Sequence, residues 1–317
     1  MRRYLPFLIS VILIFVLVGY APWDKVGHIL SDFDLGTILI LLGLSLVYYF
    51  LKTLRFWLLL QAMGVKASPR LVALSYISAQ PVSLLPAGEI YRSHALKKYA
   101  GVPFEKSIGQ FTTQGVLEGA AMAFLMVISA LALGTLRLAA IALALIVLFI
   151  ALGINRGYIT DVGKWLNRLP FVELTEAKIE NFSRRNQAVL TRQWLPVLFG
   201  LSVLIELTGA AIAYASVAGI GGHINVFQAV LVYAIPIIVG FISLLPGGFG
   251  ISEQSAVGVL LLSNITVATA VAATLIMRVT IVGLGVLYGL IALVIGVYHQ
   301  KTFKQLKLSL QNAVKNR

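Results

Sequence analysis

The 317-residue sequence contains no cysteine, and only 12% of its residues are charged. The lack of cysteine excludes disulfide bonds, thiolate catalysis and cysteine-ligated metals. The four histidines are scattered along the chain, so no histidine metal cluster is visible and we expect no metal or other cofactor. The Gly-x-Ser-x-Gly, Walker and His-Glu-x-x-His motifs are also absent, so no catalytic residue is assigned.

So little charge cannot cover the surface of a water-soluble domain. Hydrophobic residues make up 59% of the chain, and its mean hydropathy is +0.92. Many of them occur in runs near the length of about 20 residues that a membrane-spanning helix needs. We therefore predict an all-α, polytopic membrane protein with six full spans: Tyr4–Tyr20, Gly36–Leu60, Ser107–Leu133, Leu138–Ile154, Leu195–Gly219 and Val267–Tyr298.

The net charge of +13 would suggest nucleic-acid binding in a soluble protein. Here the basic residues lie between the apolar runs, so the positive-inside rule explains them better, and no nucleic-acid partner is expected. We place both termini in the cytoplasm and the chain in the cytoplasmic membrane. In that layout every Lys and Arg except Lys25, Arg137 and Arg278 faces the cytoplasm, where anionic lipids attract basic surfaces.

Two apolar segments, Leu71–Ala100 and Phe227–Leu262, are broken in their middle. Residues 83–88 read Ser-Leu-Leu-Pro-Ala-Gly and residues 243–248 read Ser-Leu-Leu-Pro-Gly-Gly, an offset of 160 residues. Each copy follows a long span and a half-length apolar limb, and each precedes another long span. We predict two re-entrant helical hairpins, because irregular backbone at membrane depth must be shielded by protein or a wet cavity. A plain eight-span arrangement is the alternative.

The two copies predict an internal repeat within one membrane domain that covers residues 1–317. An odd number of crossings separates them, so they would lie upside down relative to each other, as in many secondary transporters. The alternative is a coincidental Pro-Gly turn in two helical connections. The expected divisions are a first helix and outer loop (1–35), repeat 1 (36–154), a basic cytoplasmic loop (155–194), repeat 2 (195–298) and a basic tail (299–317).

Charged residues inside a membrane cost about 2.5–3.5 kcal/mol each at its centre, and by default they mark functional sites. Both Pro-Gly motifs also resemble helix N-termini, whose free N–H groups and partial positive charge favour anions. Glycines that only permit a tight turn and close packing are the alternative interpretation. The candidate substrate-binding residues are Pro86, Gly88, Glu89, Arg92, Pro246, Gly247, Gly248, Gly250, Glu253 and Arg278.

The remaining membrane charges have simpler interpretations. Glu89 and Arg92 share a helix face and would neutralise each other, while the partner of Glu253 would be Arg278 or the substrate. Glu118 and Glu206 lie in long spans with no base nearby in sequence, so each would be protonated within the bundle or relay protons. Lys52 and Arg55 lie near the end of a span, where snorkelling of the side chain to the interface is expected.

The motif Leu85-Pro-Ala-Gly-Glu-Ile-Tyr-Arg92, the motif Leu245-Pro-Gly-Gly-Phe-Gly-Ile-Ser-Glu253 and the later Arg278 resemble the membrane region of lysylphosphatidylglycerol synthases. The resemblance covers essentially the whole chain. It implies a flippase-like protein, because this region is associated with flipping aminoacylated phosphatidylglycerol while a separate soluble domain makes that lipid. The soluble domain is expected to be absent here. The resemblance supports Glu89, Arg92, Glu253 and Arg278 as functional residues.

The sequence therefore predicts a flippase-like transporter, not an enzyme, that moves an anionic phospholipid or related lipid across the cytoplasmic membrane. The two repeats would alternate in opening around the headgroup while the acyl chains stay in the bilayer. One alternative is an intramembrane transferase that uses Glu89 or Glu253 as a base. Another is a non-catalytic partner subunit of a separate lipid-modifying enzyme.

Overall fold

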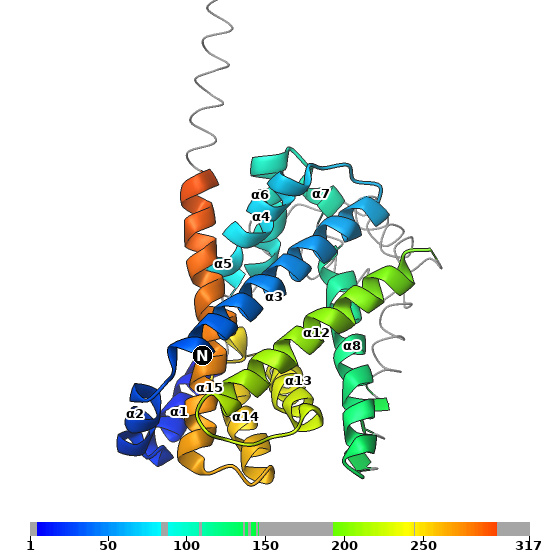
Figure 1. The fold of residues 1–317 in the computed structure, drawn as a ribbon. Helices are drawn as coiled ribbons and strands as arrows, with labels where there is room; N and C mark the ends of the chain where they lie inside the picture. The colour runs from blue at the N-terminus through cyan, green and yellow to red at the C-terminus, as the bar shows by residue number, and fades with distance from the viewer. Residues whose placement is uncertain are drawn as a thin grey trace, which may run out of the picture.

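A computed structural model describes residues 5–83, 88–107, 110–135, 137–138, 141–143, 145, 193–243 and 245–296. All the regular structure in these ranges is helical (Figure 1), so the predicted all-α class is confirmed. Most of the expected span Leu138–Ile154, nearly all of the basic loop (155–194) and the basic tail lie outside the described residues.

Five described helices are long and apolar enough to cross a membrane. The first four are α3 (Leu35–Ala62), α8 (Gln110–Ala132), α12 (Leu195–Ala218) and α13 (Val226–Ser243). The fifth is a continuous helix, Val267–Gly296, which consists of α15 (Val267–Arg278), a π-helical stretch η2 (Val279–Gly283) and their continuation. The bounds of α3 and α12 differ by at most two residues from the predicted spans, because uninterrupted apolar runs determine both helices.

Helix α13 is longer than the half-length limb expected before the second Pro-Gly motif. Its 18 residues give a length of about 27 Å, close to the thickness of about 30 Å of the hydrocarbon core. Pro236 lies inside the helix without ending it. In membranes an interior proline is tolerated, because neighbouring groups satisfy the backbone that it frees.

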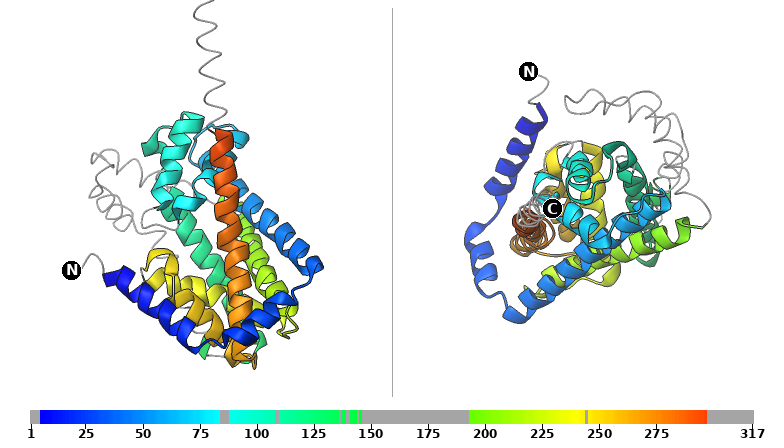
Figure 2. Two further views of the ribbon diagram at one scale, coloured as in Figure 1. Left: turned by 90° about the vertical axis from the view of Figure 1, so that its left-hand side faces the viewer. Right: turned by 90° about the horizontal axis from the view of Figure 1, so that it is seen from above.

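The expected first span, Tyr4–Tyr20, is matched by a helix that continues after a sharp bend into a second one. Helix α1 (Leu5–Tyr20) and helix α2 (Trp23–Ser31) meet at an angle of 82°. Pro22 lies at this bend, where it cannot donate a backbone hydrogen bond and disfavours helical geometry in the residue before it. Figure 2 shows α1 running across the flank of the bundle rather than within it.

Both broken segments fold back on themselves as helical hairpins. In the first, α4 (Pro69–Ser78) and the short α5 (Gln80–Ser83) precede α6 (Gly88–Ala100), and α4 packs against α6. In the second, α13 packs against α14 (Ile251–Leu262) after the tight turn η1 (Pro246–Gly248). The contacts establish the fold-back, whereas re-entry from one membrane face stays a prediction.

Helices α3 and α12 lie side by side and run antiparallel (Figure 1). At one end Gly219, the C-cap of α12, lies against Thr37 of α3. At the other end Arg55 of α3 donates a hydrogen bond to Ser202 of α12. The order of long helix, hairpin and long helix occurs once from α3 to α8 and again from α12 to α15. An inverted repeat requires such antiparallel first helices, and the inversion itself stays a prediction.

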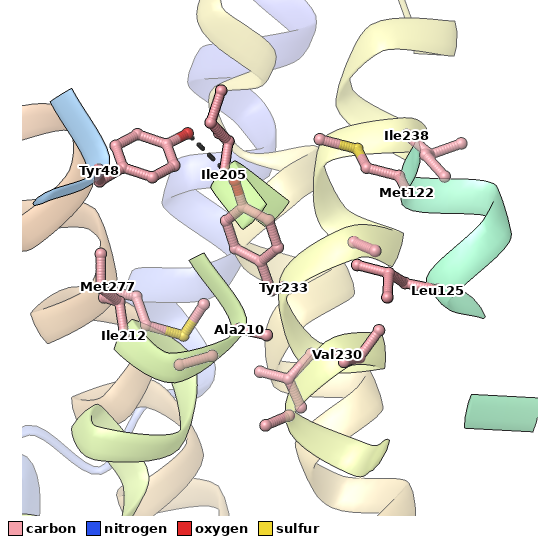
Figure 3. Close-up of a cluster of buried hydrophobic side chains, with 14 of the residues drawn as sticks. Tyr48, Met122, Leu125, Ile205, Ala210, Ile212, Val230, Tyr233, Ile238 and Met277 are labelled. Atoms are coloured by element: carbon pink, nitrogen blue, oxygen red, sulfur yellow. Dashed lines mark hydrogen bonds between the residues drawn. The ribbon is translucent and has the colours of Figure 1, made fainter. Parts of the chain in front are cut away.

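The apolar core lies where α3, α8, α12, α13 and α15 meet. Figure 3 shows Ile205 beside the paired hydroxyls of Tyr48 and Tyr233, with Ile212, Val230 and Met277 further along the same apolar cluster. Polar groups therefore enter the centre of an otherwise apolar bundle, and they define the candidate site.

Candidate functional site

One face of α3 carries polar side chains from its middle towards its end. They recur every three or four residues, which places them on the same side of the helix: Ser45, Tyr48, Tyr49, Lys52 and Arg55. Ser45, Tyr48, Tyr49 and Arg55 are buried, whereas Leu46, Val47 and Phe50 on the opposite side are exposed. The exposed side therefore suits lipid, and the polar stripe faces the protein interior.

The Arg55 side chain ends in a buried charge cluster. Its residue exposure is 0%, its Nη2 forms an ion pair with Glu118 of α8, and its Nη1 lies 3.0 Å from the Ser202 hydroxyl. The Lys52 ammonium also approaches Glu118, at 3.6 Å. The expectation that Arg55 snorkels to the interface is wrong, because a carboxylate 63 residues away offers it a partner inside the bundle.

Glu206 lies beside this cluster. It occupies the middle of α12 with 1% exposure, within electrostatic range of Glu118, Lys52 and Arg55. Neither of its carboxyl oxygens receives a hydrogen bond from any residue that the structure describes. Of the two glutamates considered for proton transfer, Glu118 is thus ion-paired, whereas Glu206 has no ion pair with a described residue.

The first hairpin brings Arg92 into the interior. Arg92 is 5% exposed, and its guanidinium lies 4.2 Å from the centre of the Tyr76 ring, a cation–π distance. It also lies within electrostatic range of Glu118. Gly88 begins α6, while Pro86 and the side chain of Glu89 lie outside the described residues, so the Glu89–Arg92 pair stays a prediction.

The tip of the second hairpin depends on glycine. Gly247, Gly248 and Gly250 have φ angles of +59°, +66° and +87°, which side-chain-bearing residues rarely adopt. A Cβ atom on Gly248 would lie 2.6 Å from the Ser252 hydroxyl and 3.2 Å from the Cα of Gly240. The glycines therefore permit both the left-handed turn and the close approach of α13 and α14, which is the packing interpretation of the motif.

Glu253 closes the N-terminus of α14. Its Oε2 accepts a hydrogen bond of 2.7 Å from the backbone N–H of Gly250, as in a capping box. A carboxylate of the protein itself thus accepts from a backbone N–H that was expected to bind a substrate anion. An incoming anion at this helix end would have to displace Glu253, so the more accessible donor is Arg278.

Arg278 is the partner of Glu253, one of the two partners predicted for it. Its Nε lies 2.5 Å from Glu253 Oε1, and its guanidinium lies 5.4 Å from the ring centre of Phe249. The buried Nη2 of Arg278 has no hydrogen-bond partner among the described residues. The Nε donor of the guanidinium is therefore used for the ion pair, and Nη2 remains available to donate to an anion.

The backbone directly after Arg278 is π-helical, over Val279–Gly283. Side chains of α3 bind carbonyl groups in this stretch: Tyr49 donates to Ile281 at 2.5 Å and Ser45 donates to Thr280 at 3.1 Å. Such π-bulges are often found at functional sites. The polar stripe of α3 thus supports the irregular backbone beside Arg278.

A cavity of about 80 Å³ adjoins the Glu253–Arg278 pair. It lies between α13, α14 and the long helix that contains Arg278, and its lining includes Tyr233, Pro236, Ile237 and Ser252. Ile237 is 36% exposed, so the lining extends to the outer surface of the bundle. At about 30 Å³ per water molecule, the cavity has room for a small polar group but not for a whole lipid.

The family model described as "Lysylphosphatidylglycerol synthase TM region" matches residues 4–289. The chain belongs to this family. It is also 22% identical over 320 residues to a UPF0104 membrane protein of Methanothermobacter thermautotrophicus, with 91% of each chain covered. Together with the long apolar helices, this membership makes the chain a multi-pass membrane protein of a lipid-related family.

The resemblance noted in the sequence is thereby confirmed for this synthase-region family. In the span after the first Pro-Gly motif, Thr113 and Gln114 are buried, and the carboxylate of Glu118 follows one turn later. Arg55 of α3 supplies the positive charge that the local sequence of α8 lacks.

Lys52 and Arg55 were not expected as partners of Glu118, and Tyr48 and Tyr233 were not expected in the site. A signal for three of them was present, because a polar stripe at helical spacing within an apolar span indicates an interior face. Tyr233 carries no such signal, since its neighbours on α13 are apolar. Among the described elements, α6 of the first hairpin and α14 of the second do not pack extensively against each other. Arg92 and Arg278 therefore belong to separate clusters.

Proposed function

We propose that this protein moves lipids with an anionic headgroup across the cytoplasmic membrane, without chemically modifying them. The observation that carries the proposal is the buried Nη2 of Arg278 beside a cavity, which has no hydrogen-bond partner in the part of the chain that the structure describes. A phosphodiester oxygen is a suitable acceptor for it, because guanidinium groups bind phosphate through planar, charge-assisted hydrogen bonds. Family membership supports a lipid as the molecule that carries this phosphate.

The position of the cavity supports entry of a headgroup from the side. Ile237 is partly exposed on the surface of α13, so a headgroup could enter while its acyl chains remain among the lipids. The volume of about 80 Å³ requires the walls to separate before a full headgroup fits. Movement of the hairpin α13–α14 against the long helix Val267–Gly296 would provide this separation, and the glycine-rich tip is a suitable hinge.

Glu253 contributes to selectivity in this proposal. It holds Arg278 in place when no lipid is bound, and it repels an anion that does not offer better contacts than its own carboxylate. A phosphate that binds Nη2 can then compete for the Nε donor as well. Exchange of the arginine between a protein carboxylate and a lipid phosphate would couple binding to local opening of the site.

The test uses purified wild-type protein in proteoliposomes that contain fluorescent phosphatidylglycerol. The accessibility of the label to a membrane-impermeant quencher reports its movement between leaflets. Arg278→Ala should slow movement roughly tenfold or more, since a hydrogen bond to a charged group contributes about 1.5–3 kcal/mol. Arg70→Ala is the matched control and should behave as wild type, because Arg70 is exposed at the start of α4.

A second variant separates loss of the site from loss of folding. Arg278→Gln combined with Glu253→Gln removes both charges, leaves no orphaned ion and should also be inactive while eluting as a folded protein. Wild-type rates in both Arg278 variants would contradict the assignment of the site. Mass spectrometry of the lipid after the assay should show an unchanged molecule, and a modified product would favour the transferase alternative instead.

A further inference from the structure

Glu206 has no role in the headgroup site described above. Its carboxyl group is almost completely buried in the middle of α12, and both oxygens lack hydrogen bonds from the described residues. An ionised carboxylate in such a place is strongly unfavourable, because burial removes its hydration without replacing it. A polar group of this kind persists in a membrane interior mainly where function requires it.

Charged and titratable groups approach Glu206 from three of the helices that pack against α12. Helix α3 contributes Tyr48, Lys52 and Arg55, helix α8 contributes Glu118, and helix α13 contributes Tyr233. The long helix Val267–Gly296 also packs there, and Arg278, the one charged residue of its α15 part, is paired with Glu253.

The two cations nearest Glu206 are already engaged. Arg55 and Lys52 both approach the carboxylate of Glu118, so an ionised Glu206 would add a second negative charge without a cation of its own. The Tyr233 hydroxyl faces Glu206 but lies 3.0 Å from the Tyr48 hydroxyl, with which it shares a hydrogen bond. Burial and the charge of Glu118 therefore favour the neutral acid, whereas Lys52, Arg55 and the Tyr233 hydroxyl favour the ionised form, so a change in nearby charge can shift Glu206 between the two.

Tyr233 connects Glu206 with the cavity. Its side chain is among those that line the cavity beside Glu253 and Arg278, and its hydroxyl belongs to the buried pair with Tyr48 (Figure 3). A negative charge that enters the cavity would thus come close to Glu206. It would favour the neutral acid further, and by linkage a protonated Glu206 would favour the bound anion.

We propose that Glu206 takes up one proton from the aqueous phase when an anionic headgroup occupies the cavity, and releases it when the headgroup leaves. This inference rests on the proposed function and adds its driving force, since a proton and an anion would move together. A proton gradient could then drive the lipid uphill. Glu118, the other predicted candidate, is left with a structural role because its charge is satisfied by Arg55.

The first test does not require transport. Infrared difference spectra of the purified full-length protein report the C=O stretch of protonated carboxyl groups before and after addition of short-chain phosphatidylglycerol. Wild type should gain intensity in this band, Glu206→Gln should lose the gain, and Asp32→Asn, which removes an exposed carboxylate, should keep it. An equal gain in wild type and Glu206→Gln, or no gain in wild type, would overturn the proposal.

The second test uses the proteoliposome assay with and without an imposed pH gradient. The rate of the wild-type protein should respond to the gradient, and the response should be lost in Glu206→Gln, which mimics the neutral acid. An unchanged response in Glu206→Gln would overturn the inference and leave lipid transport intact. A wild-type protein that moves no lipid but shows the Glu206 band change would overturn transport and uphold the proton-linked site.

Discussion

Arg55 and Glu118 illustrate how the interior of a membrane protein holds full charges. Each charge alone would cost about 2.5–3.5 kcal/mol at the membrane centre, but the two meet in an ion pair that Ser202 and Lys52 extend. Breaking a buried pair by removing one partner is worse than removing both, because the remaining charge is left uncompensated. This asymmetry makes the role of the pair testable.

Glu118→Gln should lower the free energy of unfolding by about 3–5 kcal/mol, because it strands the fully buried Arg55. Arg55→Met should cost less, since Lys52 remains 3.6 Å from Glu118. The double variant should recover much of the loss seen in Glu118→Gln. Thermal unfolding in detergent measures all three, with the exposed Lys97→Met as a control. Equal stability of Glu118→Gln and wild type would show that the pair is not formed in the membrane protein.

The arrangement of helices follows from sequence only where a feature is local. The apolar runs predicted α3 and α12 almost residue by residue, and the second Pro-Gly motif lies at the turn between α13 and α14. The 82° bend at Pro22 was not predicted, although proline is the local cause. Partners far apart in sequence were also missed, since a span such as α8 contains no sign that Arg55 will face Glu118.

The second hairpin illustrates what glycine contributes to an element. Ser252 at the start of α14 donates a hydrogen bond to the carbonyl of Pro236 at 2.9 Å, and this contact needs α13 and the tip to approach closely. Gly240 and Gly248 make that approach, with no side chain between the two backbones. The hairpin therefore depends on two glycines that face each other across it, in addition to the left-handed backbone of its turn.

Gly248→Ala should destabilise the protein more than Gly101→Ala does. Both glycines have a φ of +66°, so both substitutions pay the strain of about 1–2 kcal/mol for left-handed backbone. A Cβ on Gly101 meets nothing within 4 Å, whereas one on Gly248 meets the Ser252 hydroxyl at 2.6 Å. Combining Gly248→Ala with Ser252→Ala should recover part of the difference in unfolding temperature. Equal losses in the two alanine variants would mean that the tip is looser than the contacts indicate.

At the scale of the whole molecule, charge separates along the bundle. Asp32 and Asp34 lie at the end of the bundle where α3 begins. The end of α12 and the start of α15 lie at the same end, because Thr37 and Thr269 lie against glycines that follow α12. Lys66, Arg70, Lys97 and Lys98 lie where α3 ends, α4 begins and α6 ends. The positive-inside rule predicts that the basic end faces the cytoplasm and the acidic end the outside.

The natural absence of cysteine allows this orientation to be tested with single-cysteine variants. His223→Cys, in the exposed α12–α13 connection, should react with a membrane-impermeant maleimide in intact cells. Lys97→Cys, exposed near the end of α6, should react only after permeabilisation. Val47→Cys, on the exposed apolar face of α3, should be protected by lipid in both cases. The reverse pattern for His223 and Lys97 would invert the predicted topology.

The same labelling distinguishes a re-entrant hairpin from two full spans. The test is needed because α13 is nearly long enough to cross the membrane. Leu245, at the tip, is only partly buried, so a cysteine there can react if water reaches it. A re-entrant tip should react far more slowly than His223→Cys from either side, and bound phosphatidylglycerol should slow it further. Rapid labelling of Leu245→Cys from the cytoplasm would mean that the hairpin crosses the membrane completely. Arg278 and Glu253 would then lie near the cytoplasmic surface instead of at the depth that the proposed lipid transport requires.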